Sequence, residues 1–138
     1  MTNGARPAAV LDASALIAFV QEEEGFRRVR SAIEHGALIS AVNWAETLAD
    51  MAERGEAVET AEPRVRTRIA EVGTLGVVAF DQAQATETAR LRVRTQSLGL
   101  SLADRACLAL GRLRRLPVLT ADRAWRSLPL SIRIEVIR

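Results

Sequence analysis

The sequence predicts an α/β fold built around a parallel sheet, and three observations point to it. Short apolar runs alternate along the chain with longer segments of helical character. The runs are apolar throughout, as is typical of strands buried on both faces of a parallel sheet. No linker, repeat or low-complexity tract interrupts the chain, so we expect one domain over residues 1–138.

Each element follows from local pattern. Apolar runs predict five strands, at residues 8–11, 37–40, 75–80, 116–120 and 132–137. Helical periodicity, with glycines at several of the expected helix ends, predicts helices at residues 14–24, 25–35, 42–54, 56–72, 81–98 and 101–115, with a short helical turn around Trp125. The helix at 56–72 is expected to break or restart near Pro63. The alternation at residues 64–68 leaves a strand open there.

Composition excludes several classes of protein. No apolar run approaches the roughly 20 residues that span a bilayer, and the polar segment 1–7 lacks the apolar core of a signal peptide. We therefore expect a cytoplasmic protein that does not enter the membrane. The single Cys107 excludes an intrachain disulfide. With His35 as the one histidine, a metal site must rest on oxygen ligands, which favours Mg²⁺ or Mn²⁺.

Two aspartates come at the ends of predicted strands. Asp12 follows Val10-Leu11, and Asp122 follows the strand that ends at Thr120. In open α/β sheets, functional sites form at the carboxyl ends of strands. Each aspartate could equally cap the helix that follows it, which is a common structural use of this residue. The hydroxyls of Ser14 and Thr120 lie close in sequence to the two aspartates and could support them.

Two further acids lie on predicted helices. Asp104 stands near the start of an otherwise apolar helix, where Ser101 and Asp104 fit a capping box. Glu46 shares a helix face with Asp50 and Glu53, and by periodicity alone it is an ordinary exposed glutamate. Three or four carboxylates at one sheet edge would repel one another unless a cation or a proton neutralised them. Such a cluster suits phosphoryl transfer, in which bound metal ions polarise the phosphate and activate water.

Four segments together resemble a known family. They are VLDASAL (10–16), SAVNWAE (40–46), LSLADRACLALG (100–111) and VLTADRAW (118–125). Their order and spacing are similar to those of PIN-domain ribonucleases and, more narrowly, of the VapC toxins of bacterial type II toxin–antitoxin (VapBC) modules. The resemblance covers essentially the whole chain, with Trp125 where phenylalanine is more usual.

The resemblance implies a three-layer α/β/α sandwich with a mostly parallel five-stranded sheet, and a Mg²⁺- or Mn²⁺-dependent endoribonuclease. It further implies homodimers, a VapB-like antitoxin partner, contact with DNA only through that antitoxin, and cleavage to 5′-phosphate and 3′-hydroxyl ends. Carried over by position, the catalytic and metal-binding residues would be Asp12, Glu46, Asp104 and Asp122, with Ser14 and Thr120 in support.

The residues that could bind RNA are less clearly marked in the sequence than the acids. The net charge is only +2, although all 19 basic residues are arginines, whose guanidinium groups suit phosphate binding. Candidate contacts to the RNA backbone are Arg90, Arg94, Arg105 and Arg112, and a solvated basic face explains the same residues. Two other functions stay open: a receiver-like phosphoacceptor, which would need a lysine this chain lacks, and a PIN-like module that binds RNA or protein without cutting.

Overall fold

The core of the molecule is a five-stranded sheet in the order β3-β2-β1-β4-β5, and every pairing is parallel. The computed structural model describes residues 5–138; residues 1–4, part of the polar segment expected at 1–7, lie outside the described residues. The strands are β1 (Val10–Leu11), β2 (Ala37–Ser40), β3 (Leu75–Val78), β4 (Val118–Thr120) and β5 (Ile134–Val136). All five predicted strands are present, several of them shorter than expected.

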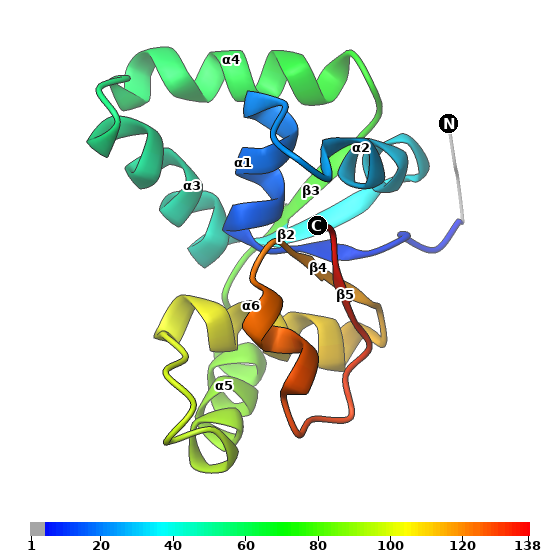
Figure 1. Cartoon of the computed structure of the whole chain (residues 1–138), viewed down its shortest axis with the longest axis vertical. Helices are drawn as coiled ribbons and strands as arrows, with labels where there is room; N and C mark the ends of the chain where they lie inside the picture. The colour runs from blue at the N-terminus through cyan, green and yellow to red at the C-terminus, as the bar shows by residue number, and fades with distance from the viewer. Residues whose placement is uncertain (1–4) are drawn as a thin grey trace.

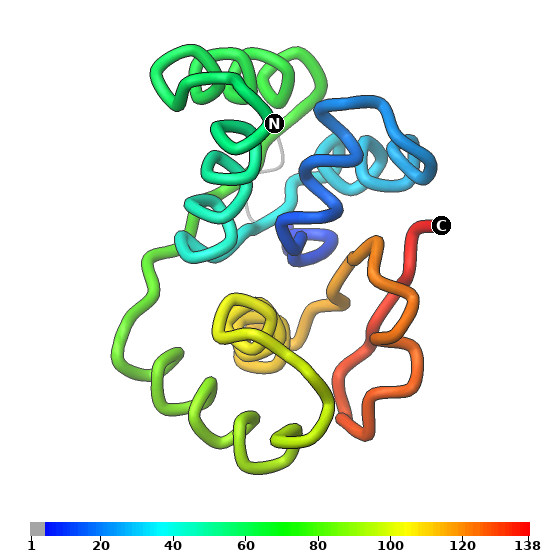
Figure 2. The backbone as a smooth tube through the Cα atoms, turned by 60° about the vertical axis from the view of Figure 1, so that its left-hand side comes forward, coloured from blue at the N-terminus to red at the C-terminus, as the bar shows by residue number. Residues whose placement is uncertain are grey.

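Helices cover both faces of this sheet, as Figures 1 and 2 show. Helices α1 to α4 lie on one side and α5 and α6 on the other, so the predicted three-layer sandwich is confirmed. The helices are α1 (Ala13–Gln21), α2 (Phe26–His35), α3 (Ala41–Glu53), α4 (Val58–Ala70), α5 (Gln82–Arg94) and α6 (Leu102–Arg114), followed by a 3₁₀ turn η1 (Arg123–Ser127).

The two faces of the central strands form two separate apolar cores. Leu11 and Leu119 pack with α1 to α4, whereas their neighbours Val10 and Val118 pack with α5, α6 and η1. This division follows from the period of two along a strand, which sends successive side chains to opposite faces. Strands covered on both faces must be apolar at every position, which is why their sequences do not alternate.

Helix α4 differs from the prediction because it passes through Pro63 without a break. A proline inside a helix removes one N–H donor and crowds the preceding turn. Ala61, Val65 and Ile69 are buried on one face of α4 and pack into the core on both sides of the proline. This packing holds the helix together where local sequence favours an interruption.

Among residues 5–138, no helix has the length and apolar character that crossing a bilayer requires.

Helix α6 lies close against the sheet at Gly111. A Cβ added there would overlap the side chain of Val118 in β4, so only glycine permits this approach. The close packing joins α6, whose first turn carries Asp104, to β4, the strand that precedes Asp122.

Candidate active site

The ends of two neighbouring strands create the centre of the candidate site. Asp12 directly follows β1, and Asp122 follows β4 after one intervening residue. Because β1 and β4 pair in parallel, their carboxyl ends meet at the same edge of the sheet. Both aspartates also cap the element that follows: Asp12 Oδ1 accepts from Ala15 N at 2.8 Å, and Asp122 Oδ1 accepts from Ala124 N at 3.0 Å. The capping and site interpretations therefore hold together.

Two hydroxyls hold Asp12 in place. Ser14 Oγ donates to Asp12 Oδ1 at 2.7 Å, and Thr120 Oγ1 donates to Asp12 Oδ2 at 2.5 Å. Each hydroxyl also accepts from the backbone on the β4 side, Ser14 Oγ from Ala121 N at 2.9 Å and Thr120 Oγ1 from Asp122 N at 3.0 Å. The two residues thus connect the β1 and β4 ends and orient the Asp12 carboxylate.

Burial makes Asp12 an unusual carboxylate. Its residue is 5% exposed, and this burial raises the pKa of Asp12 to about 6 from an ordinary 3.8. The hydrogen bonds from Thr120, Ser14 and Ala15 act in the opposite direction, and the negative charge of Asp104 adds to the rise. A carboxylate held in this way is stabilised in its charged form by a nearby cation.

Helices α3 and α6 bring the other two acids to the same place. Glu46 extends from α3 and Asp104 from the first turn of α6, and Asn43 joins the helices by donating from Nδ2 to the carbonyl oxygen of Ala103 at 3.1 Å. Partial burial and then the negative charge of Asp104 raise the pKa of Glu46. Asp104 forms the predicted capping box with Ser101, so it too combines a structural role with a place in the site.

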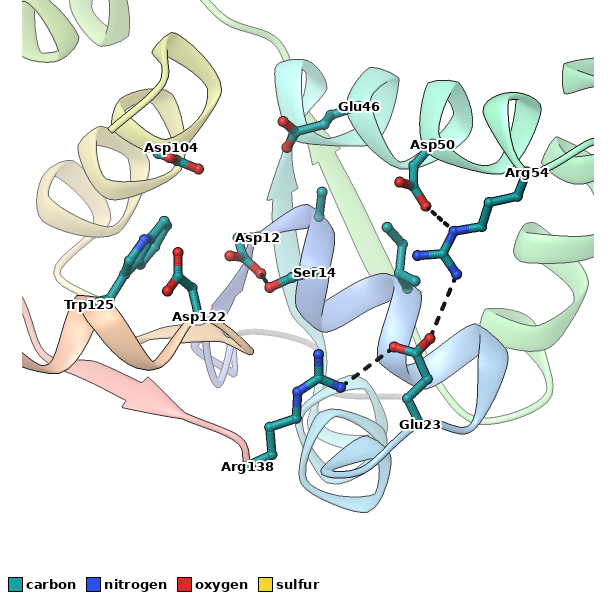
Figure 3. A pocket seen from close by; sticks show the side chains of 12 residues that line it. Asp12, Ser14, Glu23, Glu46, Asp50, Arg54, Asp104, Asp122, Trp125 and Arg138 are labelled. Carbon is teal, nitrogen blue, oxygen red and sulfur yellow. Dashed lines mark hydrogen bonds and ion pairs between the residues drawn. The ribbon is translucent and has the colours of Figure 1, made fainter. Parts of the chain in front are cut away.

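All four predicted carboxylates line one cavity of about 310 Å³. Figure 3 shows Asp12 between Asp122 on one side and Glu46 on the other, with Asp104 facing them from α6. Among the described residues, none of the four forms an ion pair with an arginine. The four carboxylates therefore converge on this cavity without a direct ion pair to any of them, although Arg54 and Arg138 also line it.

The donor set fits a hard divalent cation, since carboxylate and hydroxyl oxygens are what Mg²⁺ and Mn²⁺ prefer. Within residues 5–138, no three acidic, histidine or cysteine side chains form a ready-made ligand cluster. Mg²⁺ in proteins keeps several waters and binds through one or two carboxylates plus substrate phosphate. Asp12 is the best placed of the four, because it is buried and fully oriented.

The predicted RNA-binding arginines lie elsewhere, and none of them lines this cavity. Arg105 is buried at 4% exposure, and its Nε donates to Thr95 Oγ1 at 3.0 Å. Arg90 and Arg112 both pair with Glu87, at 3.1 and 3.2 Å, and Arg94 is exposed near the end of α5. Arg105 and Arg112 connect α6 to the end of α5 or to α5 itself, and Arg90 pairs within α5. The structure therefore does not favour these three as contacts beside the site.

The cavity contains charged residues that the sequence did not indicate. Asp50 and Arg54 follow Glu46 at successive four-residue steps along α3 and its end, and Glu23 and Arg138 come from distant parts of the chain. The shared helix face of Glu46 and Asp50 was visible in the sequence, and extending it by one turn would have found Arg54. Nothing local connects Glu23 with Arg138.

Comparison with known proteins agrees with this arrangement. A family model described as the PIN domain matches residues 9–129, which is most of the chain. The chain belongs to the PIN-domain family. This membership excludes the receiver-like alternative. Among curated proteins, no sequence matches this chain.

Several solved structures share the PIN fold with this chain. A DNA-bound VapBC from Salmonella typhimurium is 22% identical with a TM-score of 0.73, covering 95% of this chain and 98% of its own. VapBC2 from Rickettsia felis, bound to a promoter DNA fragment, is 12% identical with a TM-score of 0.74 over 95% and 99%. VapC20 of Mycobacterium tuberculosis, a sarcin-ricin loop cleaving toxin, is 14% identical with a TM-score of 0.69 over 91% and 99%.

Proposed function

We propose that this protein is a metal-dependent endoribonuclease that acts as the toxin of a type II toxin–antitoxin pair. The observation that carries the proposal is the convergence of Asp12, Glu46, Asp104 and Asp122 on one cavity without a cationic partner. Membership of the PIN-domain family and structural similarity to VapC toxins support it. The second reading, a PIN domain that binds RNA without cutting, offers no reason to retain four mutually repelling carboxylates.

The four acids would hold Mg²⁺ or Mn²⁺, with Asp12 as the anchor. When bound, a divalent cation supplies positive charge that polarises a phosphodiester and lowers the pKa of water. Ser14 and Thr120 keep the Asp12 carboxylate in one orientation through hydrogen bonds of 2.7 and 2.5 Å. Such preorganisation avoids the cost of arranging the group during the reaction.

The remaining acids stand on elements that cannot easily move apart. Asp122 is held by its own turn and Asp104 by its capping box, while Asn43 ties α3 to α6 between Glu46 and Asp104. Burial first, and then the negative charge of Asp104, raises the pKa of Glu46. Both effects disfavour its charged form in the absence of a cation, and a bound cation would favour it. Phosphate oxygens of RNA would approach these carboxylates only with that charge compensated.

The proposal extends to partners. Similar structures are described as toxin–antitoxin complexes, two of them bound to DNA. We accordingly expect a VapB-like antitoxin to bind this chain, DNA to be contacted only through the antitoxin, the toxin to form a homodimer, and the RNA substrate to be met in the cytoplasm.

The test is cleavage of total RNA by purified protein free of any partner, with Mg²⁺, with Mn²⁺ and with chelator. Discrete fragments with 5′-phosphate and 3′-hydroxyl ends are expected in the presence of metal. Asp12→Asn should abolish them. The matched control is Asp81→Asn, because Asp81 caps α5 by accepting from Gln84 N at 2.9 Å but lies outside the cavity.

Asp81→Asn should cleave like the parent protein. RNA binding without metal-dependent cleavage by folded parent protein would contradict the nuclease proposal and favour the non-cutting alternative. Equal loss of cleavage in both variants would show that capping, not the site, explains the effect of Asp12→Asn.

A further inference from the structure

One wall of the acidic cavity carries a row of alternating charges formed by Asp50, Arg54, Glu23 and Arg138. Arg54 Nε lies 2.8 Å from Asp50 Oδ2, and Arg54 Nη1 lies 3.7 Å from Glu23 Oε2. The other oxygen of Glu23 lies 3.6 Å from Arg138 Nη1. Figure 3 shows this row at the side of the cavity occupied by the end of α1 and α3, next to Asp12 and Asp122.

The two arginines are held at different points of the backbone. Arg54 caps the C-terminus of α3, where Asp50 one turn earlier fixes its Nε. Arg138 is held through its main chain, since its carbonyl oxygen accepts from Arg123 Nε at 3.2 Å. The residue before it lies so close to Gly25 that a Cβ added to Gly25 would come within 2.5 Å of the carbonyl oxygen of Ile137. The arginine positions are therefore built into the fold.

Glu23 holds the same arginines only weakly. Its two contacts exceed 3.5 Å, and the side chains of Glu23 and Arg54 are 34% and 51% exposed. Exposed ion pairs of this kind contribute from about 0 to 1 kcal/mol. A phosphate oxygen forms shorter, charge-assisted bonds with a guanidinium group and competes well with such a carboxylate.

The distribution of charge in the cavity suggests that Arg54 and Arg138 could bind phosphate groups. Of its lining residues, Arg54 and Arg138 are the arginines, and the others that carry charge are acids. A polyanion that brings one phosphate to the carboxylates must place its neighbouring phosphates against the walls. Among the described residues that line the cavity, only Arg54 and Arg138 offer these phosphates positively charged hydrogen-bond donors.

We propose that Arg54 and Arg138 bind RNA phosphates that flank the cleaved one, and that Glu23 competes with the RNA for both arginines. The inference rests on the proposed function in taking RNA as the substrate. It assigns a substrate-binding role to two residues outside the acidic quartet, and it makes Glu23 a residue that weakens binding.

The experiment measures the affinity of the otherwise unchanged protein and its variants for a fluorescent, mixed-sequence 12-nucleotide single-stranded RNA. The buffer contains Ca²⁺ in place of Mg²⁺, because Ca²⁺ also takes oxygen ligands and the four carboxylates stay in place to hold it. A gel of each sample checks that the RNA stays intact during the measurement. Arg54→Gln and Arg138→Gln should each raise Kd roughly tenfold, as expected for loss of a hydrogen bond to a charged group. Each should also lower the slope of log Kd against log salt by about 0.7, the contribution of one phosphate contact on a single strand.

Glu23→Gln should lower Kd, by about threefold, because it releases both arginines to the RNA. If the ion pairs only stabilise the fold, Glu23→Gln should instead raise Kd, because the two arginines would lose the contacts that hold them in place. Arg54→Lys should recover the salt slope, because it restores the charge without the planar guanidinium fork.

The matched control is Arg30→Gln. Arg30 pairs with an acid four residues away, Glu34, at 3.8 Å and does not line the cavity. Its side chain is 52% exposed, close to the 51% of Arg54. Affinity and salt slope of Arg54→Gln and Arg138→Gln equal to those of Arg30→Gln would overturn the phosphate contacts. Unchanged or weaker binding by Glu23→Gln would overturn the competition.

This assay separates the inference from the nuclease proposal. Arginine-dependent binding by a protein that never cleaves RNA in metal would support the inference and contradict the nuclease. Metal-dependent cleavage that Arg54→Gln and Arg138→Gln leave unchanged in both kcat and KM would support the nuclease and overturn the inference.

Discussion

The acidic cavity and the α5–α6 face (Glu87, Arg90, Arg105 and Arg112) both hold buried charge, but they treat it in opposite ways. Glu87, whose side chain is 8% exposed, lies within 3.1 and 3.2 Å of two arginines. Asp12 is equally buried and is met only by hydroxyls and a backbone N–H. The paired carboxylate joins α5 to α6, whereas the unpaired one is free to hold a cation under the proposed function.

The same difference bears on the arginines that the sequence suggested as contacts to the RNA backbone. Arg90 and Arg94 stand four apart on one helix, which suggested a basic face for RNA. Arg90 is instead satisfied by Glu87 three residues earlier, and Glu87 in turn reaches Arg112 on α6. Charge that the fold has already neutralised contributes little to attracting a polyanion.

The largest expected effect is on RNA cleavage, when a glutamate is replaced by glutamine in the acidic cavity and, for comparison, on the α5–α6 face. Glu46→Gln should lower kcat/KM for RNA by about 10²–10³-fold, since metal-borne charge stabilisation is worth several kcal/mol. Its thermal stability should not fall, because the fold disfavours the charged form of Glu46, as its raised pKa shows. Glu87→Gln should leave cleavage intact but cost about 2 kcal/mol of stability through two lost charge-assisted bonds. Parallel kinetics and denaturant unfolding measure both, and a loss of activity in Glu87→Gln would break the comparison.

The second effect is a pH dependence specific to Asp12. Its folded pKa of about 6 lies above the ordinary 3.8, so between these values the folded state binds the extra proton. Without metal, stability should therefore fall as pH rises from about 4 to 6 and level off above, by about 3 kcal/mol from this one group.

The measurement compares the free energy of unfolding of the parent and Asp12→Asn in chelator at several pH values. The variant should lack this decline, so that the difference between the proteins changes across the window. Parallel pH profiles of the two proteins would show that the pKa of Asp12 is not raised by folding.

A smaller effect on stability should follow from adding a divalent cation. Mg²⁺ or Mn²⁺ at ten times its Kd should stabilise the folded protein by about 1.4 kcal/mol at neutral pH. This stabilisation by metal, measured as the shift in Tm, should disappear in Asp12→Asn and persist in Glu87→Gln. Equal protection of both variants would place the cation away from the acidic cavity.

The smallest effect concerns the α5–α6 face itself. Arg112→Gln should cost less than about 1 kcal/mol, because the Arg112 side chain is partly exposed and Glu87 keeps Arg90. Cleavage of RNA and its salt dependence should match the parent protein. A reduced salt slope would restore Arg112 as a contact to the RNA backbone.

Much of the site was already visible in local pattern. Strand ends located Asp12 and Asp122, and the spacing of Ser101 and Asp104 predicted the capping box that the structure contains. Glu46 was the weak case, because an exposed helical glutamate has no local feature that sets it apart. Only its approach to Asp104 across the α3–α6 contact distinguishes it, and that contact joins residues far apart in the chain.

Local sequence was enough to predict the succession of strands and helices along the chain, the burial of the sheet on both faces and the acids at the ends of β1 and β4, because hydrophobic period and capping act over a few residues. Which charges remain without partners depends on the tertiary structure. Pairing of Glu87 with Arg112, and the meeting of Glu23 with Arg138 beside the acids, depend on distances between elements remote in sequence. Electrostatic energy depends on those distances and on burial, and neither is encoded in any short stretch of chain.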